Sequence, residues 1–218
     1  MAVVARSIAV SLDGYMAGPD QDADHPLGVG GPRLHEWVFA TRTGREMIGE
    51  AGGDTGIDDE LFARGFEGVG ATLMGRNMFG PVRGPWGDSD WRGWWGPEPP
   101  YHHPVFVLTH HARPQLAVGE TTFHFGTDGL ESGLRQAVAA AGPLDVRVGG
   151  GAQTLQQLLR ARRLDELHVA IVPVLLGAGE RLFDGLGVGG VDDVDGYECV
   201  RLVASPAVAH VVLRRTSG

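Results

Sequence analysis

The sequence contains no lysine, since all 18 basic residues in its 218 are arginines. This absence excludes Schiff-base chemistry, a P-loop lysine and a Tyr–Lys proton relay, because each requires a side-chain amine. Any contact with a phosphate group must therefore come from arginine, histidine, a hydroxyl group or backbone N–H groups.

Cysteine is nearly absent as well. The single residue, Cys199, cannot build a disulfide framework or a thiolate zinc cluster. It falls in a segment that we expect to be a strand, and we expect it to be buried and inert. The nine histidines show no compact ligand spacing, so we predict no metal site.

Long apolar runs are missing too. No window approaches the roughly 18 apolar residues of a membrane span, and the first residues lack the apolar core of a signal peptide. We therefore expect a cytoplasmic protein without membrane contact. The net charge of −9 makes a nucleic acid a poor candidate partner.

Apolar periodicity predicts alternating strands and helices. We expect strands over residues 3–12, 71–74, 105–109, 121–125, 146–148, 167–175, 198–204 and 208–215, and helices over 34–40, 58–66, about 130–141 and after 151. This order predicts one α/β domain, residues 1–218, with a mostly parallel sheet and an antiparallel C-terminal hairpin.

Residues 80–104 are dense in glycine, proline and tryptophan, and we expect a long loop there. Long loops inside compact domains are usually functional or disordered. Its four tryptophans suit a cap over a flat heteroaromatic substrate, or a dimer interface.

A glycine triplet, Gly149-Gly150-Gly151, follows a predicted strand and precedes an amphipathic helix. Such a junction lets the backbone and the positive helix end approach an anion such as a pyrophosphate. A tight turn without a ligand explains the same triplet equally well. The spacing differs from the G-x-G-x-x-G fingerprint, which argues against an ordinary Rossmann dehydrogenase.

Two further strand ends carry groups that suit anions. Gly75 and Arg76 follow one strand, and Thr109, His110 and His111 follow another. Ligands of open α/β sheets gather at the carboxyl ends of strands, so three such ends in one sheet together predict a shared anion site.

These segments, taken in order, resemble a known family. Residues 11–17 (SLDGYMA), 74–79 (MGRNMF), 149–152 (GGGA), 164–168 (LDELH), 171–179 (IVPVLLGAG) and 182–183 (LF) resemble the signature blocks of the C-terminal reductase domain of bifunctional riboflavin-biosynthesis deaminase–reductases. The resemblance spans nearly the whole chain, and it implies the dihydrofolate-reductase-like three-layer α/β fold.

The same resemblance implies an NADPH site. It assigns Leu12 and the Met16-Ala17 backbone to the nicotinamide amide, Gly75 and Arg76 to phosphates, with Arg76 near the 2′-phosphate, Thr109 and His110 to the adenosine end, and Gly149, Gly150, Gly151, Ala152 and Thr154 to the pyrophosphate. The family often has arginine where this chain has His110, which bears on selectivity for the 2′-phosphate.

The proton donor is open between two carboxylates. Glu36 lies on the first predicted helix, where true dihydrofolate reductases carry a carboxylate, although a solvated helix residue is an equal reading. Asp13 is the other candidate, although an Asp-Gly turn needs no chemistry to explain it.

The leading functional hypothesis is an NADPH-dependent reductase of a pterin-like or related small heterocycle. The riboflavin-pathway ribosylaminouracil phosphate is an alternative substrate, weakened by the lack of basic residues near the end of the first strand. A nucleotide-binding module without turnover is the other alternative. The resemblance also implies a homodimer, with residues 208–215 or 167–175 as possible edges.

Overall fold

The computed structural model describes residues 1–80, 83–87, 90–186 and 196–216. The strands are β1 (Val3–Ser11), β2 (Tyr15–Ala17), β3 (Val69–Gly75), β4 (Val105–Leu108), β5 (Leu116–Val118), β6 (Thr121–Gly126), β7 (Asp145–Gly150), β8 (Glu166–Val172), β9 (Glu180–Arg181), β10 (Tyr197–Ala204) and β11 (Ala209–Arg215). The α-helices are α1 (Glu36–Ala40), α2 (Arg42–Met47), α3 (Ile57–Ala63), α4 (Arg76–Phe79), α5 (Gly129–Ala141) and α6 (Ala152–Arg160), with short 3-10 helices η1 (Gly31–His35) and η2 (Arg64–Phe66).

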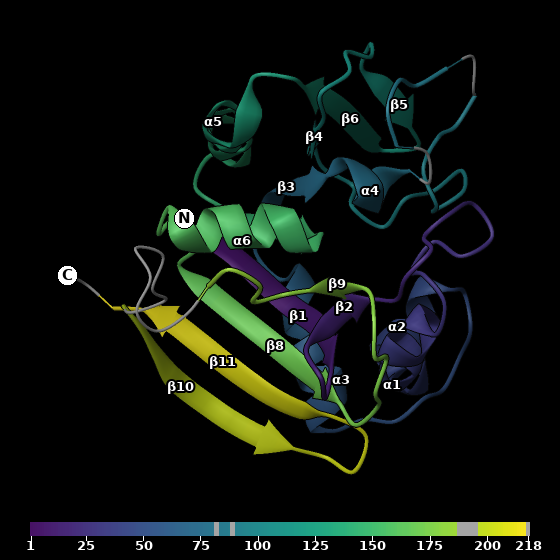
Figure 1. The fold of residues 1–218 in the computed structure, drawn as a ribbon, viewed down its shortest axis with the longest axis vertical. Coiled ribbons are helices and arrows are strands. Elements are labelled where there is room, and N and C mark those ends of the chain that lie inside the picture. Colours follow the sequence, from purple (N-terminus) through teal and green to yellow (C-terminus); the bar gives the residue numbers. More distant parts are fainter. Residues whose placement is uncertain (81–82, 88–89, 187–195, 217–218) are drawn as a thin grey trace.

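One nine-stranded sheet, in the order β10-β11-β8-β1-β7-β3-β4-β6-β5, crosses the part of the molecule that the structure describes (Figure 1). The six central strands, from β8 to β6, run parallel. β11 and β10 continue the sheet antiparallel on one side, and β5 does so on the other. The predicted mostly parallel α/β sheet with an antiparallel C-terminal hairpin is confirmed.

Helices cover both faces of this sheet. α5 and α6 pack on one face, where Leu134 and Leu155 join the largest apolar cluster with residues of β1, β3 and β7. On the opposite face α1 and α3 contribute Trp37 and Phe62 to a second cluster. Burying an apolar face of each helix against the sheet is what holds such layers together.

The tryptophans of the segment between α4 and β4 pack inward. Trp86, Trp91 and Trp95 are half-buried against a third cluster that includes Phe79 and Phe123. The described parts of this segment form neither helix nor strand, as expected. Within the described residues these three rings therefore extend the protein's own core beside β4 and β6.

Three expectations are wrong. Cys199 is exposed, because it lies on the edge strand β10, most of whose residues are open to solvent. The strand expected over residues 167–175 ends at Val172, before Pro173, which has no N–H for a sheet hydrogen bond. Neither segment named as a dimer edge is an edge, because β11 and β8 both lie inside the sheet.

None of the helices in the described parts of the chain is long and apolar enough to cross a membrane. Within the same residues, no three His, Cys, Asp or Glu side chains come together as metal ligands.

Candidate functional site

A cavity of about 340 Å³ opens where four parallel strands end. The last residues of β3, β4 and β6 and the residue after β7 contribute to its wall, together with the first residues of α4, α5 and α6. Predicted site residues that line it are Gly75, Arg76, Thr109, His110, Gly151, Ala152 and Thr154. The three strand ends singled out in the sequence therefore meet in one place.

The turn from β7 into α6 brings backbone amides to this cavity. α6 begins at Ala152, directly after Gly151, and no side chain caps its N-terminus. The amides of a helix's first turn have no partner within the helix, and the helix dipole adds positive potential there. This end of α6 is therefore suited to an anion such as a pyrophosphate.

Gly75 is needed for the close approach of β3 to that turn. A Cβ atom at this position would lie 2.8 Å from Thr154 Oγ1 and 3.6 Å from the Gly151 amide nitrogen. The peptide bond between Gly150 and Gly151 is cis, and Gly150 has a φ of +128°. Gly149 and Gly150 do not line the cavity themselves, but they form the end of the strand that carries Gly151 to it.

Arg76 brings a positive charge whose hydrogen-bonding capacity is largely unused. Its guanidinium lies over the ring of Trp86, 3.3 Å from the ring centre. The Nε and Nη1 atoms are buried and have no protein partner among the described residues. Burial, and secondarily the charge of Arg113, lowers the pKa of Arg76 to about 10, so the side chain stays charged at neutral pH. A buried, charged donor of this kind fits a phosphate.

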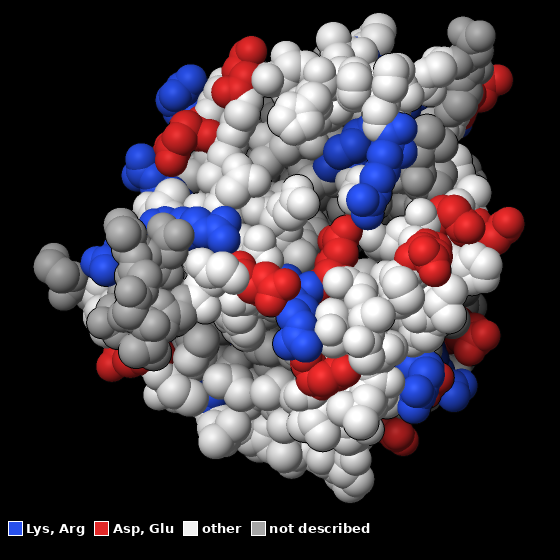
Figure 2. Space-filling model, viewed as in Figure 1, with Lys and Arg blue, Asp and Glu red and all other residues white. Residues whose placement is uncertain are grey.

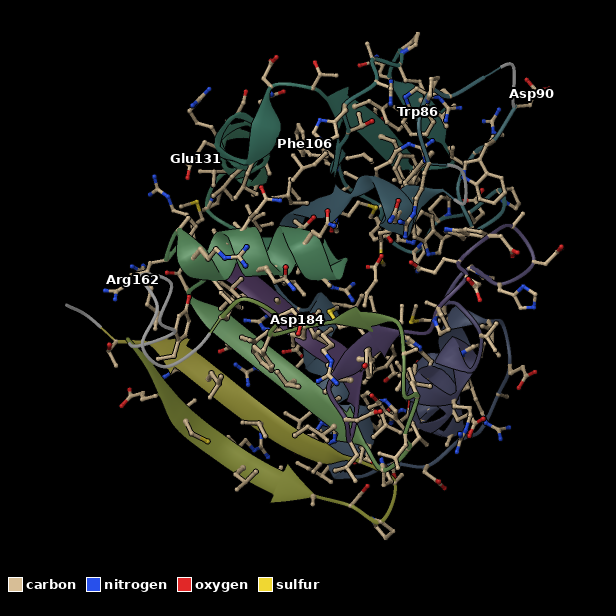
Figure 3. All side chains as sticks on the ribbon, in the orientation of Figure 1. Trp86, Asp90, Phe106, Glu131, Arg162 and Asp184 are labelled. Atoms are coloured by element: carbon tan, nitrogen blue, oxygen red, sulfur yellow. The ribbon has the colours of Figure 1, made fainter. Side chains whose placement is uncertain are left out.

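Aromatic rings hold this arginine in place. Trp86 lies in the part of the molecule that holds α4, β5 and β6 (Figure 3), and its Nε1 donates to the carbonyl of His111 at 2.7 Å. The guanidinium of Arg113 lies 4.8 Å from the centre of the same ring. Two guanidinium groups thus lie against one indole ring, and of these Arg76 is the one that lines the cavity.

An ion pair crosses the cavity wall. Arg83 Nη2 lies 3.0 Å from Glu180 Oε1, and both residues line the cavity. Arg83 belongs to the segment after α4, whereas Glu180 lies on β9, so two segments distant in sequence meet here. The surrounding face of the molecule mixes basic and acidic side chains (Figure 2).

The third strand end is held by local bonds. Thr109 is buried and its Oγ1 accepts from the His111 amide at 3.1 Å, while His110 is exposed at the cavity wall.

The residues assigned to the nicotinamide lie outside this cavity. Leu12 follows β1 and is 65% exposed, while Met16 and Ala17 form part of β2. β2 pairs with β9, which also carries Glu180 of the cavity wall. The two predicted regions of the site are thus connected through this short two-stranded sheet.

The two candidate proton donors occupy different settings. Glu36 is exposed at the first position of α1. Asp13 accepts hydrogen bonds from Ser11 Oγ at 2.5 Å and from the amides of Leu176 and Gly177 at 3.2 and 2.8 Å. The hydroxyl of Ser11 above all lowers the pKa of Asp13 to about 2. Asp13 is therefore ionised at neutral pH and ties the turn after β1 to the segment after β8.

Several cavity residues were not anticipated from the sequence. They are Asn77, Arg83, Gly84, Leu108, Gly126, Thr127, Gly129, Leu130, Gln153, Gln157 and Glu180. Gly126 and Thr127 could have been found, because they follow a predicted strand as Gly75 and Arg76 do. Nothing near Arg83 or Glu180 in the sequence indicates that they pair.

The arrangement fits a dinucleotide. It combines an uncapped helix N-terminus, a glycine contact that a Cβ atom would fill, and an arginine with two buried nitrogens that have no partner in the described parts of the chain. These are the groups expected around a pyrophosphate and a further phosphate.

Comparisons with known proteins identify the family of the chain. The family model of the RibD C-terminal domain matches residues 2–202. A protein assigned by name to riboflavin biosynthesis in Shewanella sp. PV-4 superposes with a TM-score of 0.58 at 21% identity, over 100% of both chains. No curated protein gives a match.

A second solved structure is a diaminohydroxyphosphoribosylaminopyrimidine deaminase/5-amino-6-(5-phosphoribosylamino)uracil reductase from Thermotoga maritima. It has a TM-score of 0.56 at 16% identity, and the match covers 98% of this chain but 56% of the Thermotoga protein. A dihydrofolate reductase from Enterococcus faecalis gives a TM-score of 0.49 at 13% identity, over 99% of this chain and 97% of that one. The chain belongs to the RibD C-terminal domain family, a family of reductase domains with the dihydrofolate-reductase-like α/β fold.

Proposed function

We propose that this chain is an NADPH-dependent reductase that transfers a hydride to a pterin-like or related small heterocyclic substrate. The proposal takes residues 1–218 as one cytoplasmic reductase domain. The observation that carries it is Arg76, a charged side chain in the strand-end cavity whose buried Nε and Nη1 have no partner in the part of the chain that the structure describes. Membership of a reductase-domain family supports the same conclusion.

The proposed cofactor contacts follow the cavity wall. Gly151, Ala152 and Thr154, at the start of α6, would hold the pyrophosphate, and Arg76 the 2′-phosphate. Thr109 and His110 would lie at the adenosine end. The nicotinamide would then extend toward β2, to the Leu12, Met16 and Ala17 backbone.

Bound NADPH would supply the hydride for reduction of a C=N or C=O bond. The chain's own residues have to orient the ring, exclude water and deliver a proton to the nitrogen or oxygen. Of the two carboxylates, Glu36 is the better proposed donor, because the hydrogen bonds to Asp13 keep that carboxylate ionised. We assign Asp13 a positioning role at the β1–β2 turn.

Nucleotide titration of purified protein tests the cofactor site. We expect NADPH to bind in the micromolar range and Arg76→Met to weaken it at least tenfold, or about 1.4 kcal/mol. Methionine keeps an unbranched apolar side chain while removing the charged group that lies over Trp86. If Arg76 contacts the 2′-phosphate, the affinity for NADH should change much less.

The matched control is Arg135→Met, because Arg135 is exposed on α5 and donates to Ser132 Oγ at 3.5 Å. Its affinity for NADPH should equal that of the unmodified protein. If neither NADPH nor NADH binds the unmodified protein, the proposed function is contradicted.

A specific contact favours the riboflavin-pathway substrate as a second candidate. The sequence shows no basic residue near the end of the first strand, but in the folded chain Arg181 lies beside Tyr15, shortly after that strand. Arg181 of β9 pairs with Tyr15 of β2, and its guanidinium lies 4.4 Å from the centre of the Tyr15 ring. An exposed arginine at this turn is suited to the phosphate of a ribosylaminouracil phosphate.

Substrate kinetics separate the two candidates. If the phosphate-bearing substrate is correct, Arg181→Met should raise its KM about tenfold or more, with little change in the KM of the dephosphorylated nucleoside. Equal effects on both compounds would remove Arg181 from phosphate recognition. A preference for dihydrofolate in the unmodified protein would favour the first candidate.

A further inference from the structure

A second cavity, of about 480 Å³, lies at the amino ends of the parallel strands, opposite to the first cavity. Its wall comes from residues that precede or begin the strands, including Val69 at the start of β3 and Leu144 just before β7. The first cavity is lined instead by residues at the strands' carboxyl ends. None of the residues lining one cavity lines the other.

Arg147 gives this cavity its charge. It is the third residue of β7, between Val146 and Val148, which face the core, so its side chain emerges on the opposite face of the sheet. Its guanidinium lies 4.3 Å from the centre of the Phe66 ring, and its Nε is buried without a protein partner among the described residues. None of the salt bridges among those residues includes it.

Two neighbouring arginines, unlike Arg147, are paired with a carboxylate. Arg6 and Arg64, on the same side of the molecule, both donate to the carboxylate of Glu166 at 2.9 Å or less. Among the described residues no carboxylate pairs with Arg147, whose guanidinium lies over the ring of Phe66, and burial and the charge of Arg6 lower its pKa. Burying a charge without a counter-charge is costly, so a cavity that keeps one is typical of an anion site.

The rest of the wall suits a small organic body. Phe66, Val69, Pro100 and Leu144 offer apolar contact area. Cavities of roughly 300–1,000 Å³ with apolar walls and a few polar groups are typical ligand sites.

Polar groups stand beside the arginine. His103 shares a 2.8 Å hydrogen bond between its Nε2 and Thr72 Oγ1, and burial with the charge of Arg147 lowers the pKa of His103 to about 4. His103 is therefore neutral at physiological pH. Tyr101 is buried and also lines the cavity. The positive charge available to a ligand deep in this cavity thus comes from Arg147.

We infer that this second cavity binds a small organic anion, with its carboxylate or phosphate on Arg147 and its apolar part against Phe66, Val69, Pro100 and Leu144. This site is separate from the proposed cofactor site and does not depend on the proposed function.

Side-chain NMR on the unmodified protein tests this inference. Arginine 15Nε–1Hε resonances would be assigned through bonds and followed while benzoate or inorganic phosphate is added. The Arg147 resonance should shift with at least one of these probes and saturate in the millimolar range. An Arg147 resonance that does not move with either anion would overturn the inference.

Variants locate the binding. Arg147→Met should weaken the probe at least tenfold, measured by calorimetry, while the exposed control Arg135→Met leaves its affinity unchanged. If Arg147→Met fails to fold, Arg147→Lys is titrated in its place, and it should also weaken the probe because lysine lacks the planar guanidinium that binds an oxyanion through two hydrogen bonds. Arg76→Met should leave the Arg147 shift intact, because any phosphate on Arg76 occupies the other cavity.

The two probes distinguish the oxyanion. A shift with benzoate alone supports a carboxylate ligand, a shift with phosphate alone supports a phosphate monoester, and shifts with both support a site that accepts either group. Equal affinity of Arg147→Met and the unmodified protein for the probe would place the binding elsewhere and overturn the inference.

Discussion

Among single residues, the candidate site depends on polar side chains whose hydrogen-bonding capacity is partly unused within the described protein. Arg76 is charged, lies over Trp86 and has two buried nitrogens without a partner among the described residues, whereas both carboxylate oxygens of Asp13 accept hydrogen bonds, from one hydroxyl and two amides in all. Unused capacity is what a ligand can satisfy, and a saturated carboxylate is instead a structural tie. Arg147 likewise has a buried Nε without a partner among the described residues, whereas Arg6 and Arg64 both bind Glu166.

Glu36→Gln tests the assignment of the proton donor. Losing a general acid typically costs 10²–10⁴-fold in rate, so we expect kcat to fall roughly 100-fold with little change in the Kd of NADPH. Steady-state kinetics and nucleotide titration on the same preparation measure both quantities.

Asp13→Asn is the comparison for that prediction. Because Asp13 positions the turn that carries Leu12, its variant should weaken NADPH binding and lower kcat together. A normal kcat in Glu36→Gln, combined with a lost acid limb in the pH profile of Asp13→Asn, would reverse the two roles.

At the scale of elements, β1, β8 and β11 are joined by a chain of buried histidines. The Ser7 amide, at an irregularity in β1, donates to His168 Nδ1 at 3.1 Å. His168 Nε2 lies 2.9 Å from His210 Nδ1, and His210 Nε2 lies 3.0 Å from Asp58 Oδ1 on α3. Because Ser7 donates to His168 Nδ1, a neutral His168 must donate from Nε2 to His210.

This chain predicts a pH-dependent stability. Burial, then the neighbouring His210, lowers the pKa of His168 from 6.5 to about 4. Between roughly pH 6.5 and 4 the unfolded chain binds a proton that the folded chain does not, so stability should fall as the pH decreases through this window, by on the order of 1 kcal/mol per pH unit. Urea unfolding at several pH values measures this slope.

The slope should be reduced in His168→Gln and unchanged in His25→Gln, whose side chain is exposed. An identical slope in His168→Gln and the unmodified protein would show that another group carries the pH dependence.

Helices and strands with a regular apolar period are the elements that the sequence predicts. Strands such as residues 105–109 and the helix after 151 are predicted because their apolar residues follow a strand or helix period. α2 was missed because Arg42–Met47 contains a glycine and little apolar surface, and β2, β5 and β9 because each has at most three residues. These elements exist through their tertiary contacts, which local periodicity does not contain.

The same limit applies to the candidate site. The glycines and Arg76 are recognisable because they follow predicted strands, and strand ends converge in an α/β sheet. Arg83–Glu180 and Arg181–Tyr15 join segments far apart in the chain, so only the fold brings them together. Arg147 is hidden in a strand pattern, and nothing local distinguishes it from an arginine with a carboxylate partner.

At the scale of the whole molecule, the sheet ends on one side at β10, where Val200 and Leu202 are 40% and 72% exposed. An edge strand with exposed apolar side chains tends to pair with another chain. We propose that the family's expected homodimer forms through β10, in place of the inner strands β8 and β11.

Sedimentation equilibrium tests this dimer. We expect a dimer for the unmodified protein, a monomer for Leu202→Lys, and a dimer for the control Met47→Lys, which adds the same charge to the exposed part of α2. A monomer at every concentration of the unmodified protein, or a dimer of Leu202→Lys, would contradict the role of β10.

NADPH oxidation shows whether the cavity at the strand ends serves a reductase. Loss of NADPH absorbance would be followed with the ribosylaminouracil phosphate, with dihydrofolate and with no acceptor. We predict acceptor-dependent oxidation by the unmodified protein that falls at least tenfold in kcat/KM for Arg76→Met and is unchanged in Arg135→Met. Tight NADPH binding without oxidation by either acceptor would contradict this account and favour a nucleotide-binding module without turnover.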